Sequence, residues 1–493
     1  MSTTHHSKSA AIRARVNHPI IDSDGHTVEF EPAFLDYLRQ VGGPTVVERY
    51  LTHRGKMAET ALSPSQSRFS EAERRERRPL RYPWWTVPTK NTLDRATATL
   101  PRLLYERMEE LGLDFSVLYP TAGLFFPHSG DEELRRASCR ALNMFHADYF
   151  RAYADRMTPA AAIPMHTPQE ALEELEYAVK VLGLKAVMMA GYVRRPIRAL
   201  ARKNPEAARH ALWLDTFGLD SEYDYDPVWA KCVELKVPPS FHSVSIGLGS
   251  RTSISNYMYN HIGHFAAAGD ALCKSLFFGG VTRRFPTLKL AFLECGAGWG
   301  CSLYADLIGH WKKRNAQAMD NYNPAHLNRE HLLDLYRRYG DRLVQNHLGE
   351  VLTDLSPREK GGDPALLDDW RQCGITKAAD FREAFVPHFY FGCEADDPMN
   401  ARAFQGNPFG ARLQAIFSSD IGHWDVPDMR EVVEEAYELV EEGLITESDF
   451  RDFMFVNPVT LWTGMNPDFF KGTVVEKAVD KLRAEENPDE ASH

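Results

Sequence analysis

Carboxylate and imidazole side chains follow the first apolar segment of the chain. Residues 20–26 read Ile-Ile-Asp-Ser-Asp-Gly-His, which is typical of a short buried strand that ends in potential ligands. Asp24 and His26 are two residues apart, so on an extended backbone both side chains leave the same face and can converge on one point. This is the spacing of a metal chelate, although a lone Asp-x-His pair is weak support for a metal.

Three later apolar segments end in the same kinds of residue. They are Pro238–His242, Leu288–Glu294 and Leu413–Asp420. Four strand-like segments therefore terminate in side chains that can bind a divalent cation. Glu29, three residues after His26, has three open roles: a ligand of a second ion, a partner that orients His26, or a cap on the following segment.

The composition of the 493-residue chain is that of a large globular protein, with 44% hydrophobic and 25% charged residues. The net charge of −11 disfavours nucleic acid as a partner, because phosphate binding depends on clustered Lys and Arg. One local basic run, Arg74–Arg81, contains a glutamate and follows others, so we interpret it as a solvated helix face.

The cysteines and the apolar segments indicate the cellular setting. Seven cysteines without a C-x-x-C pair predict neither a disulfide framework nor a zinc finger, and they favour a reducing cytoplasm. No apolar run reaches the length of about 18 residues that a membrane span needs, and residues 1–10 lack the apolar core of a signal peptide. We therefore expect a cytoplasmic protein with no membrane partner.

Short apolar segments alternate with helical patterns along the chain, which is typical of β-α units around a parallel sheet. A helix is expected at residues 101–111, stopped by Gly112, and another after Thr167, where Pro168 and Glu170 complete a capping signature. Strands are expected within residues 20–26, 115–120, 159–165, 184–189, 238–242, 288–294, 388–392 and 413–420. Eight such units predict an α/β fold, a (β/α)₈ TIM barrel with helical insertions, whose catalytic groups lie at the C-terminal ends of the strands.

Two regions are longer than a minimal barrel needs. Residues 43–98 hold the basic run and the aromatic patch Tyr82-Pro83-Trp84-Trp85, and residues 321–382 form a charged, helix-prone insertion. Such excursions are usually lids or oligomer contacts. We expect one domain over residues 19–484, with disordered tails at residues 1–18 and 485–493.

Taken together, these motifs resemble the amidohydrolase superfamily, in particular the branch of aminocarboxymuconate-semialdehyde decarboxylase and related metal-dependent hydrolases. The resemblance spans about Pro19 to Gly464. It is carried by Asp-Ser-Asp-Gly-His-x-x-Glu at 22–29, Gly-Gly-Val-Thr-Arg-Arg-Phe-Pro at 279–286, Glu-x-Gly-x-Gly-Trp at 294–299 and Ser-Asp-x-x-His-Trp-Asp at 419–425. The set is specific, whereas each motif alone is not.

The resemblance implies roles for individual positions. His26 and His242 match imidazole ligands of the family, and Asp24 stands where most members have the first histidine. Asp420 matches the aspartate that both contacts the metal and transfers a proton. Strand six ends in a histidine in many relatives, whereas this chain has Glu294, so its role as a metal ligand or catalytic group is open.

Two further histidines are candidate catalytic groups. His264, in the excursion before strand six, can supply the imidazole that Glu294 replaces, and His423 follows Asp420 on the catalytic rim. Each assignment has a structural alternative. His264 can be a packed, hydrogen-bonded histidine, and Glu294 can form a buried ion pair with Arg283 or Arg284.

Imidazole and carboxylate ligands with one open position suit Zn²⁺, Mn²⁺ or Fe²⁺, as one ion or, if Glu29 and Glu294 add oxygens, as two. The leading hypothesis is a metal-dependent hydrolase in which activated water cleaves a carbonyl-type bond of a small, apolar or aromatic-containing substrate. Asp420 is placed to accept and return the proton. The alternative is a non-oxidative decarboxylase of an aromatic or unsaturated carboxylic acid, and a non-catalytic metal-binding barrel is a third. A homodimer or higher homo-oligomer is expected.

Overall fold

The structure is a computed structural model that describes residues 7–61, 69–81, 88–206, 210–354 and 367–486. Its centre is a sheet of eight strands in which the neighbouring pairs are parallel. In sheet order the strands are β1 (Ile21–Thr27), β2 (Phe115–Pro120), β3 (Met157–Ile163), β4 (Ala186–Met189), β7 (Pro239–Phe241), β8 (Leu290–Phe292), β9 (Phe389–Cys393) and β10 (Gln414–Phe417). Every predicted strand is present, with ends shifted by a few residues.

Backbone hydrogen bonds connect the segment after β10 to β1. The Asp420 N–H donates to the Asp24 carbonyl over 3.0 Å, and the His26 N–H donates to the Ile421 carbonyl over 2.7 Å. The sheet therefore closes on itself, and the predicted (β/α)₈ barrel is confirmed. The same two bonds hold the end of the last strand against the end of the first, where the candidate ligands lie.

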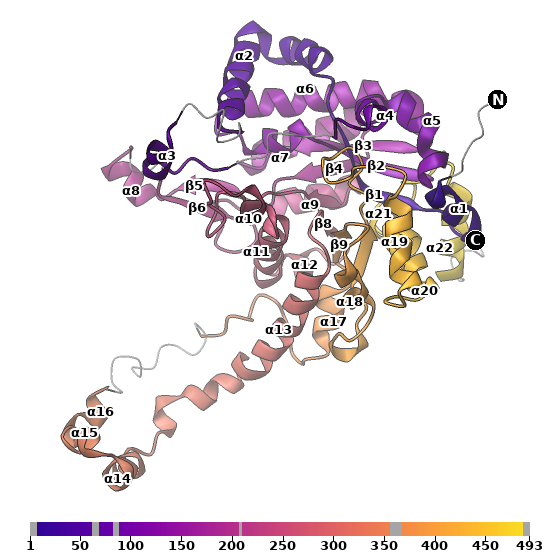
Figure 1. Cartoon of the computed structure of the whole chain (residues 1–493). Coiled ribbons are helices and arrows are strands. Elements are labelled where there is room, and N and C mark those ends of the chain that lie inside the picture. Colours follow the sequence, from indigo (N-terminus) through magenta and orange to yellow (C-terminus); the bar gives the residue numbers. More distant parts are fainter. Residues whose placement is uncertain (1–6, 62–68, 82–87, 207–209, 355–366, 487–493) are drawn as a thin grey trace.

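Helices cover the outside of the barrel (Figure 1). They include α5 (Pro101–Leu111), α6 (Glu132–Phe150), α7 (Pro168–Glu176), α9 (Asp226–Leu235), α11 (His264–Phe278), α13 (Gly298–Arg314), α19 (Val432–Glu441) and α21 (Asn457–Thr463). All residues of β1, β2, β3 and β9 are buried, as expected for parallel strands with helices outside and packed side chains inside.

The sequence signals at two helix ends act as predicted. The Thr167 side chain accepts from the Glu170 N–H at the start of α7, and the Glu170 side chain accepts from the Thr167 N–H. Helix α5 ends at Gly112, whose φ of 76° is left-handed. A Cβ there would lie 2.8 Å from the Ser9 carbonyl oxygen, so the position requires glycine.

Further helices lie before, between and after these elements. They are α1 (Lys8–Arg15), α2 (Glu31–Ala61), α3 (Glu71–Arg77), α4 (Thr92–Thr97), the 3₁₀ helix η1 (Ala122–His128), α8 (Arg198–Lys203), α10 (Tyr257–His261), α12 (Val281–Arg284), α17 (Asp380–Phe385), α18 (Ala401–Phe404), α20 (Glu447–Arg451) and α22 (Glu476–Glu486). The sequence did not predict the antiparallel hairpin of β5 (Val193–Pro196) and β6 (Leu212–Asp215), which lies between β4 and β7.

The N-terminal segment corrects the expectation of a disordered tail over residues 1–18. Its described part forms α1, which begins at the capping residue Ser7 and packs against α5 and α19. Ile12 is buried, and the Ser9 hydroxyl donates to the Arg430 carbonyl over 2.5 Å. A buried apolar side chain and a satisfied cap together hold this short helix on the barrel.

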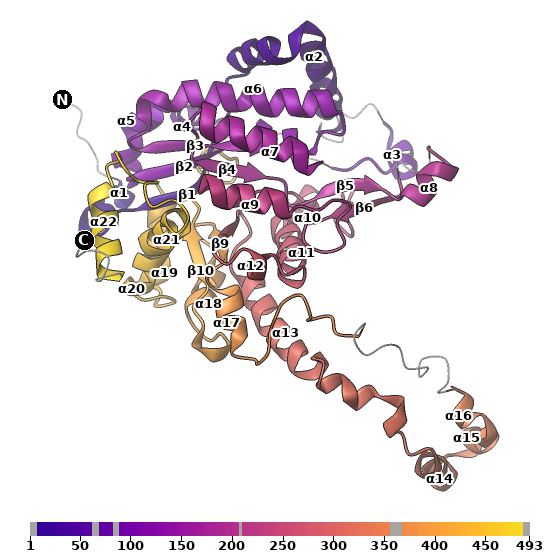
Figure 2. The ribbon, with the colours of Figure 1, turned by 180° about the vertical axis from the view of Figure 1, so that it is seen from behind.

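The two long insertions differ in their course. In residues 43–98, α2 kinks at Gly43, and α3 carries the basic run with no buried residue, as a solvated helix would. The aromatic patch at 82–85 lies outside the described residues. The second insertion extends α13 away from the barrel into η5 (Ala318–Tyr322), η6 (Pro324–His326), α14 (Arg329–Tyr339), α15 (Arg342–Gln345), η7 (Leu348–Glu350) and α16 (Val351–Asp354) (Figures 1 and 2).

Candidate metal centre

The candidate ligands meet at the C-terminal ends of the strands. Asp24 and His26 lie in β1, His242 follows the last residue of β7, Glu294 lies two residues after β8, and Asp420 lies three residues after β10. Ligand atoms fall into two groups whose members lie within 4.8 Å of one another: Asp24, His26 and His242, and His26, Glu294, Asp420 and His423. His26 belongs to both groups, so the structure gathers these six residues around one position.

The shortest distances place His26 at the centre. Its Nε2 lies 3.1 Å from His242 Nε2, 3.4 Å from Asp420 Oδ1 and 3.6 Å from Asp24 Oδ1. Around an ion with bonds near 2.0 Å in a tetrahedral site, neighbouring ligand atoms lie roughly 3.3 Å apart. The spacing of these nitrogens and oxygens therefore fits ligands that share one divalent cation.

Buried carboxylate oxygens without hydrogen bonds also indicate a divalent cation. Both carboxylate oxygens of Asp24 and of Asp420 make no well-formed hydrogen bond among the described residues, although Asp24 is fully buried and Asp420 is 2% exposed. A buried carboxylate without strong partners is costly. The donor set of two imidazoles and two carboxylates suits a divalent transition metal, so these residues fit the predicted ion.

The electrostatics also favour a cation. Burial and the charge of Glu294 raise the pKa of Asp24 and of Asp420 well above the usual value for aspartate. Burial lowers the pKa of His26 well below its usual value and that of His242 to about 4. The two imidazoles are therefore uncharged at neutral pH, with lone pairs available to a metal. A divalent cation would offset the crowded negative charge of the carboxylates.

The backbone is strained at two of the carboxylates. Glu294 has a φ of 51° and Asp420 a φ of 50°, in the left-handed region that residues with a Cβ seldom adopt. Such strain persists only where surrounding contacts enforce it, and it is concentrated at functional sites. At both positions it occurs just after a barrel strand, where the chain turns at the mouth.

Asp22 is a buried aspartate that the sequence interpretation did not single out. Its hydrogen bonds hold together the segments that carry the candidate ligands. Asp22 accepts hydrogen bonds from the Ser116 hydroxyl over 2.7 Å and from the Ser419 N–H over 2.9 Å and hydroxyl over 2.8 Å. It thereby ties β2 and the Asp420 segment to β1. A Cβ at Gly25 would lie 2.6 Å from Asp22 Oδ2, which explains the glycine between the ligands. The sequence signal that could have identified Asp22 is its spacing, two residues before Asp24.

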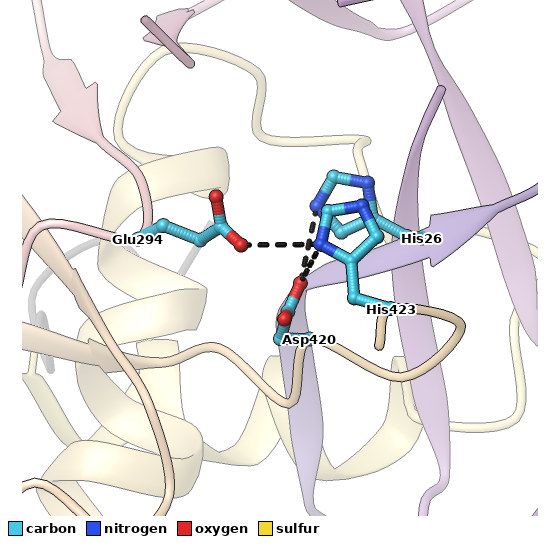
Figure 3. A group of neighbouring side chains, drawn as sticks. All are labelled: His26, Glu294, Asp420 and His423. Atoms are coloured by element: carbon cyan, nitrogen blue, oxygen red, sulfur yellow. Dashed lines mark hydrogen bonds and ion pairs between the residues drawn. The ribbon is translucent and has the colours of Figure 1, made fainter. Parts of the chain in front are cut away.

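His423 and Glu294 lie beside His26 and Asp420 (Figure 3). The His423 ring stacks on His26 at 3.6 Å, and its Nδ1 lies 2.6 Å from Asp420 Oδ1 and 3.2 Å from Glu294 Oε1. Burial alone would raise the pKa of Glu294, but the hydrogen bond with His423 opposes this effect, and the pKa of Glu294 lies well below its usual value. Among the described residues, Glu294 contacts His242 and His423, and Arg284 pairs with Asp226 over 2.6 Å. The alternative ion pair of Glu294 with Arg283 or Arg284 is therefore not formed.

Glu29 lies outside both groups of candidate ligands. Its Oε2 accepts the Ala122 N–H over 2.9 Å and its Oε1 accepts the Gly123 N–H over 2.8 Å. These are unpaired donors in the first turn of η1, so the contacts of Glu29 are those of a cap. The sequence left this role open beside that of a metal ligand.

His264 also lies outside both groups and belongs to a network at the barrel mouth. Its Nε2 lies 3.1 Å from His261 Nδ1, which lies 3.1 Å from the Tyr257 hydroxyl. Ring contacts connect this network to the site. The ring centroid of Phe265 lies 3.9 Å from that of His264 and 5.2 Å from that of His242, and the ring centroid of Trp424 lies 5.4 Å from that of His261. The sequence interpretation did not identify the roles of Tyr257 and Phe265, because no ligand spacing marks them.

Residues 114–321 match the sequence profile of a family described as Amidohydrolase. This match confirms the amidohydrolase resemblance. It also confirms the prediction of an enzyme. The amidohydrolase segment runs from just before β2 into η5 and contains His242 and Glu294, whereas Asp24, His26 and Asp420 lie outside it.

The chain is similar to several solved structures. A 2,6-dihydroxybenzoate decarboxylase from Rhizobium has 15% identity and a TM-score of 0.47, with 90% of this chain and 99% of that chain covered. Another is a dihydroxybenzoic acid decarboxylase from a Polaromonas species, with bound manganese and the inhibitor 2-nitroresorcinol. It has 17% identity and a TM-score of 0.49, and the match covers 90% of this chain and 97% of that chain. An amidohydrolase from Mycobacterium avium subspecies paratuberculosis has 17% identity and a TM-score of 0.49, covering 91% and 100%.

Among residues that the structure describes, no helix combines the length with the hydropathy that a membrane span needs.

Proposed function

We propose that this amidohydrolase is a metal-dependent hydrolase whose ion is held by Asp24, His26, His242 and Asp420. One observation carries the proposal: two uncharged imidazoles and two buried carboxylates from β1, β7 and the end of β10 lie at ligand spacing at the barrel mouth. Because the ligands come from the first and the last strands, we further propose that a single domain over residues 19–484 carries the site.

A Zn²⁺, Mn²⁺ or Fe²⁺ ion held by these four residues would polarise a carbonyl-type group and lower the pKa of water. The chain's own residues then control the protons. Asp420 accepts a proton at its carboxylate and returns it to the leaving group. His423 Nδ1, at 2.6 Å from Asp420 Oδ1, orients that carboxylate, and Glu294 Oε1 fixes His423 in turn.

We assign one ion to the site, with Glu294 and His423 as catalytic groups that face the substrate. His26 is shared by both ligand groups, so a second ion would have to use the same nitrogen or the far side of Asp420. Glu29 is satisfied by backbone N–H groups of η1 and does not enter this assignment. Two ions per chain in elemental analysis would contradict it.

His264 is proposed as a substrate-binding group. Its Nδ1 is buried without a hydrogen-bond partner in the part of the chain that the structure describes, while its Nε2 is held by the His261 and Tyr257 network. This leaves one ring nitrogen for a polar atom of the substrate. The neighbouring Phe265 and Trp424 rings suit a small substrate with an apolar or aromatic part.

A non-oxidative decarboxylase is the second candidate. The observation in its favour is the close Asp420–His423 pair, which can deliver a proton to carbon after loss of carbon dioxide. Hydrolysis and decarboxylation require the same ligands, so the ligand set alone does not separate them.

The deciding experiment combines elemental analysis with a substrate screen. Protein stripped with chelator and reloaded with Zn²⁺, Mn²⁺ or Fe²⁺ is tested on esters, thioesters, amides and hydroxylated aromatic acids. Metal-dependent turnover of the first three classes supports the hydrolase, and carbon dioxide release from the acids supports the decarboxylase. Failure of all metals on all classes favours a non-catalytic metal-binding barrel.

The setting of the enzyme is also a proposal. We place it in the cytoplasm because all seven cysteines are free thiols. A small molecule is its partner at the barrel mouth. Its net charge of −11 argues against nucleic acid.

A further inference from the structure

A helical arm leaves the barrel after α13. We define the arm as residues 318–352, from η5 into α16. Both views show that it stands away from the barrel (Figures 1 and 2). Within it, α14 packs against α15, η7 and α16.

The arm exposes large apolar side chains. Its helices α14, α15 and η7 contain no buried residue. Tyr322 is 55% exposed, Tyr336 42%, Tyr339 74% and Leu343 66%. Along α14, the spacing of Tyr336 and Tyr339 with Leu332 and Leu335 puts all four on one stripe. These side chains, which we call the open apolar face of the arm, are left exposed by the residues that the structure describes, whereas stable units are built from two packed layers.

The open face is large enough for a subunit contact. At roughly 200 Å² for each large side chain, the four exposed residues alone present roughly 500 Å². Each partner in a standard interface buries about 800 Å². The partly exposed leucines of α14 and its neighbours add to this area.

The charge of the arm favours a second copy of this chain. Residues 329–350 contain four arginines, at 329, 337, 338 and 342, and four acidic residues, at 330, 334, 341 and 350. This segment is therefore neutral, while the whole chain carries −11. Two copies repel each other through their overall negative charge but not through this segment.

We propose that two copies of the chain pair through the arm, about a two-fold axis that sets the open apolar face of one arm on that of the other. The second arm supplies the missing helical layer. This surface is separate from the metal centre and does not depend on the proposed reaction.

Sedimentation velocity of the full chain tests the pairing. From about 0.2 to about 20 µM, the wild type should sediment as a species of twice 56.0 kDa. The double variant Tyr339→Glu/Leu343→Glu should raise the dimer Kd by about 100-fold or more, because it places charge in the contact. The milder pair Tyr339→Ala/Leu343→Ala should raise it by about 10-fold, and it keeps the test valid if the charged variant misfolds.

Two matched controls lie on the barrel side. Val181 is exposed by 66%, as Leu343 is, and Leu212 in β6 is exposed by 42%, as Tyr336 is. Val181→Glu and Leu212→Glu should leave the mass unchanged. A monomeric wild type, an unchanged mass in both arm variants, or equal dissociation by either control would overturn the proposal. Circular dichroism checks that each variant is folded.

Discussion

The barrel mouth and the arm distribute their side chains in opposite ways. At the mouth, Asp24, His26 and Asp420 are almost completely buried. On the arm, Tyr339 and Leu343 are mostly exposed. Folded chains usually keep charged groups in water and large apolar groups inside. Both regions depart from this rule, in opposite directions.

The difference shows how a missing partner can be recognised from the chain alone. Buried carboxylates with poor hydrogen bonding at the mouth are explained by a cation, which supplies the charge that the protein lacks. Exposed tyrosine and leucine side chains on the arm are explained by an apolar surface, which a second arm supplies. The type of side chain out of place thus identifies the type of partner.

The largest expected effect is at the mouth. Asp420→Asn should lower turnover of the substrate found in the screen by about 10³-fold, because the amide cannot take up and return a proton. Much of the metal should remain bound, since Asp24, His26 and His242 are intact. Asp396→Asn, an exposed change on the same rim, is the control. Unchanged turnover in Asp420→Asn would remove its proton-transfer role.

A ligand deletion tests the cation itself. His26→Ala should weaken metal binding by about 100-fold or more, because this nitrogen lies within 3.6 Å of three other candidate ligands. Competition with a chromophoric chelator measures the affinity. Glu29→Gln is the matched control, and we expect its affinity to stay within about 3-fold of the wild type, since Glu29 caps η1. Equal losses in both variants would contradict this assignment.

A buried imidazole in α6 shows how burial alone changes the pKa of a histidine. His146 is 1% exposed, neither ring nitrogen has a hydrogen-bond partner among the described residues, and burial lowers its pKa to about 3. The unfolded chain takes up a proton there near pH 6.5 while the folded chain does not. The free energy of unfolding should therefore fall by about 2 kcal/mol between pH 7 and pH 5 through this residue.

Replacement of His146 isolates that contribution. In His146→Phe, the fall in the free energy of unfolding between pH 7 and pH 5 should be smaller than in the wild type by this amount. Urea unfolding at the two pH values measures it. His310→Phe, at an exposed position, should keep the wild-type fall. The account of His146 is wrong if both variants behave alike.

The smallest expected effect concerns the independence of the two regions. Removal of the metal by chelator should change the dimer Kd by less than about 2-fold, because sites with no shared contacts contribute independently. The arm variants should likewise retain the metal content of the wild type. Dissociation of the dimer on metal removal would show that the mouth and the arm are coupled.

The barrel and most of the centre were predictable because both depend on short-range patterns. Apolar segments at regular intervals predict the eight strands, and parallel strands bring residues at their C-terminal ends to one rim. Asp24, His26, His242 and Asp420 could therefore be grouped by their positions in the sequence. The capping box at Thr167 and the stop at Gly112 were equally local signals.

The remaining features depend on contacts that no local pattern shows. Helix α1 is held on the barrel by the buried Ile12 and by Ser9, whose hydroxyl bonds to residues more than 400 positions away in the sequence. Its own sequence therefore resembles a tail. Glu29 becomes a cap only because η1 lies beside β1. The hydrogen bonds of His264 and the direction of the arm likewise follow from loop courses, which periodicity does not determine.

An anomalous-difference map from a crystal of the zinc-loaded protein tests the central claim most directly. We predict one strong peak within about 2.3 Å of side-chain atoms of Asp24, His26, His242 and Asp420. A peak elsewhere, or no peak between these four residues despite one equivalent of bound zinc, would contradict the account.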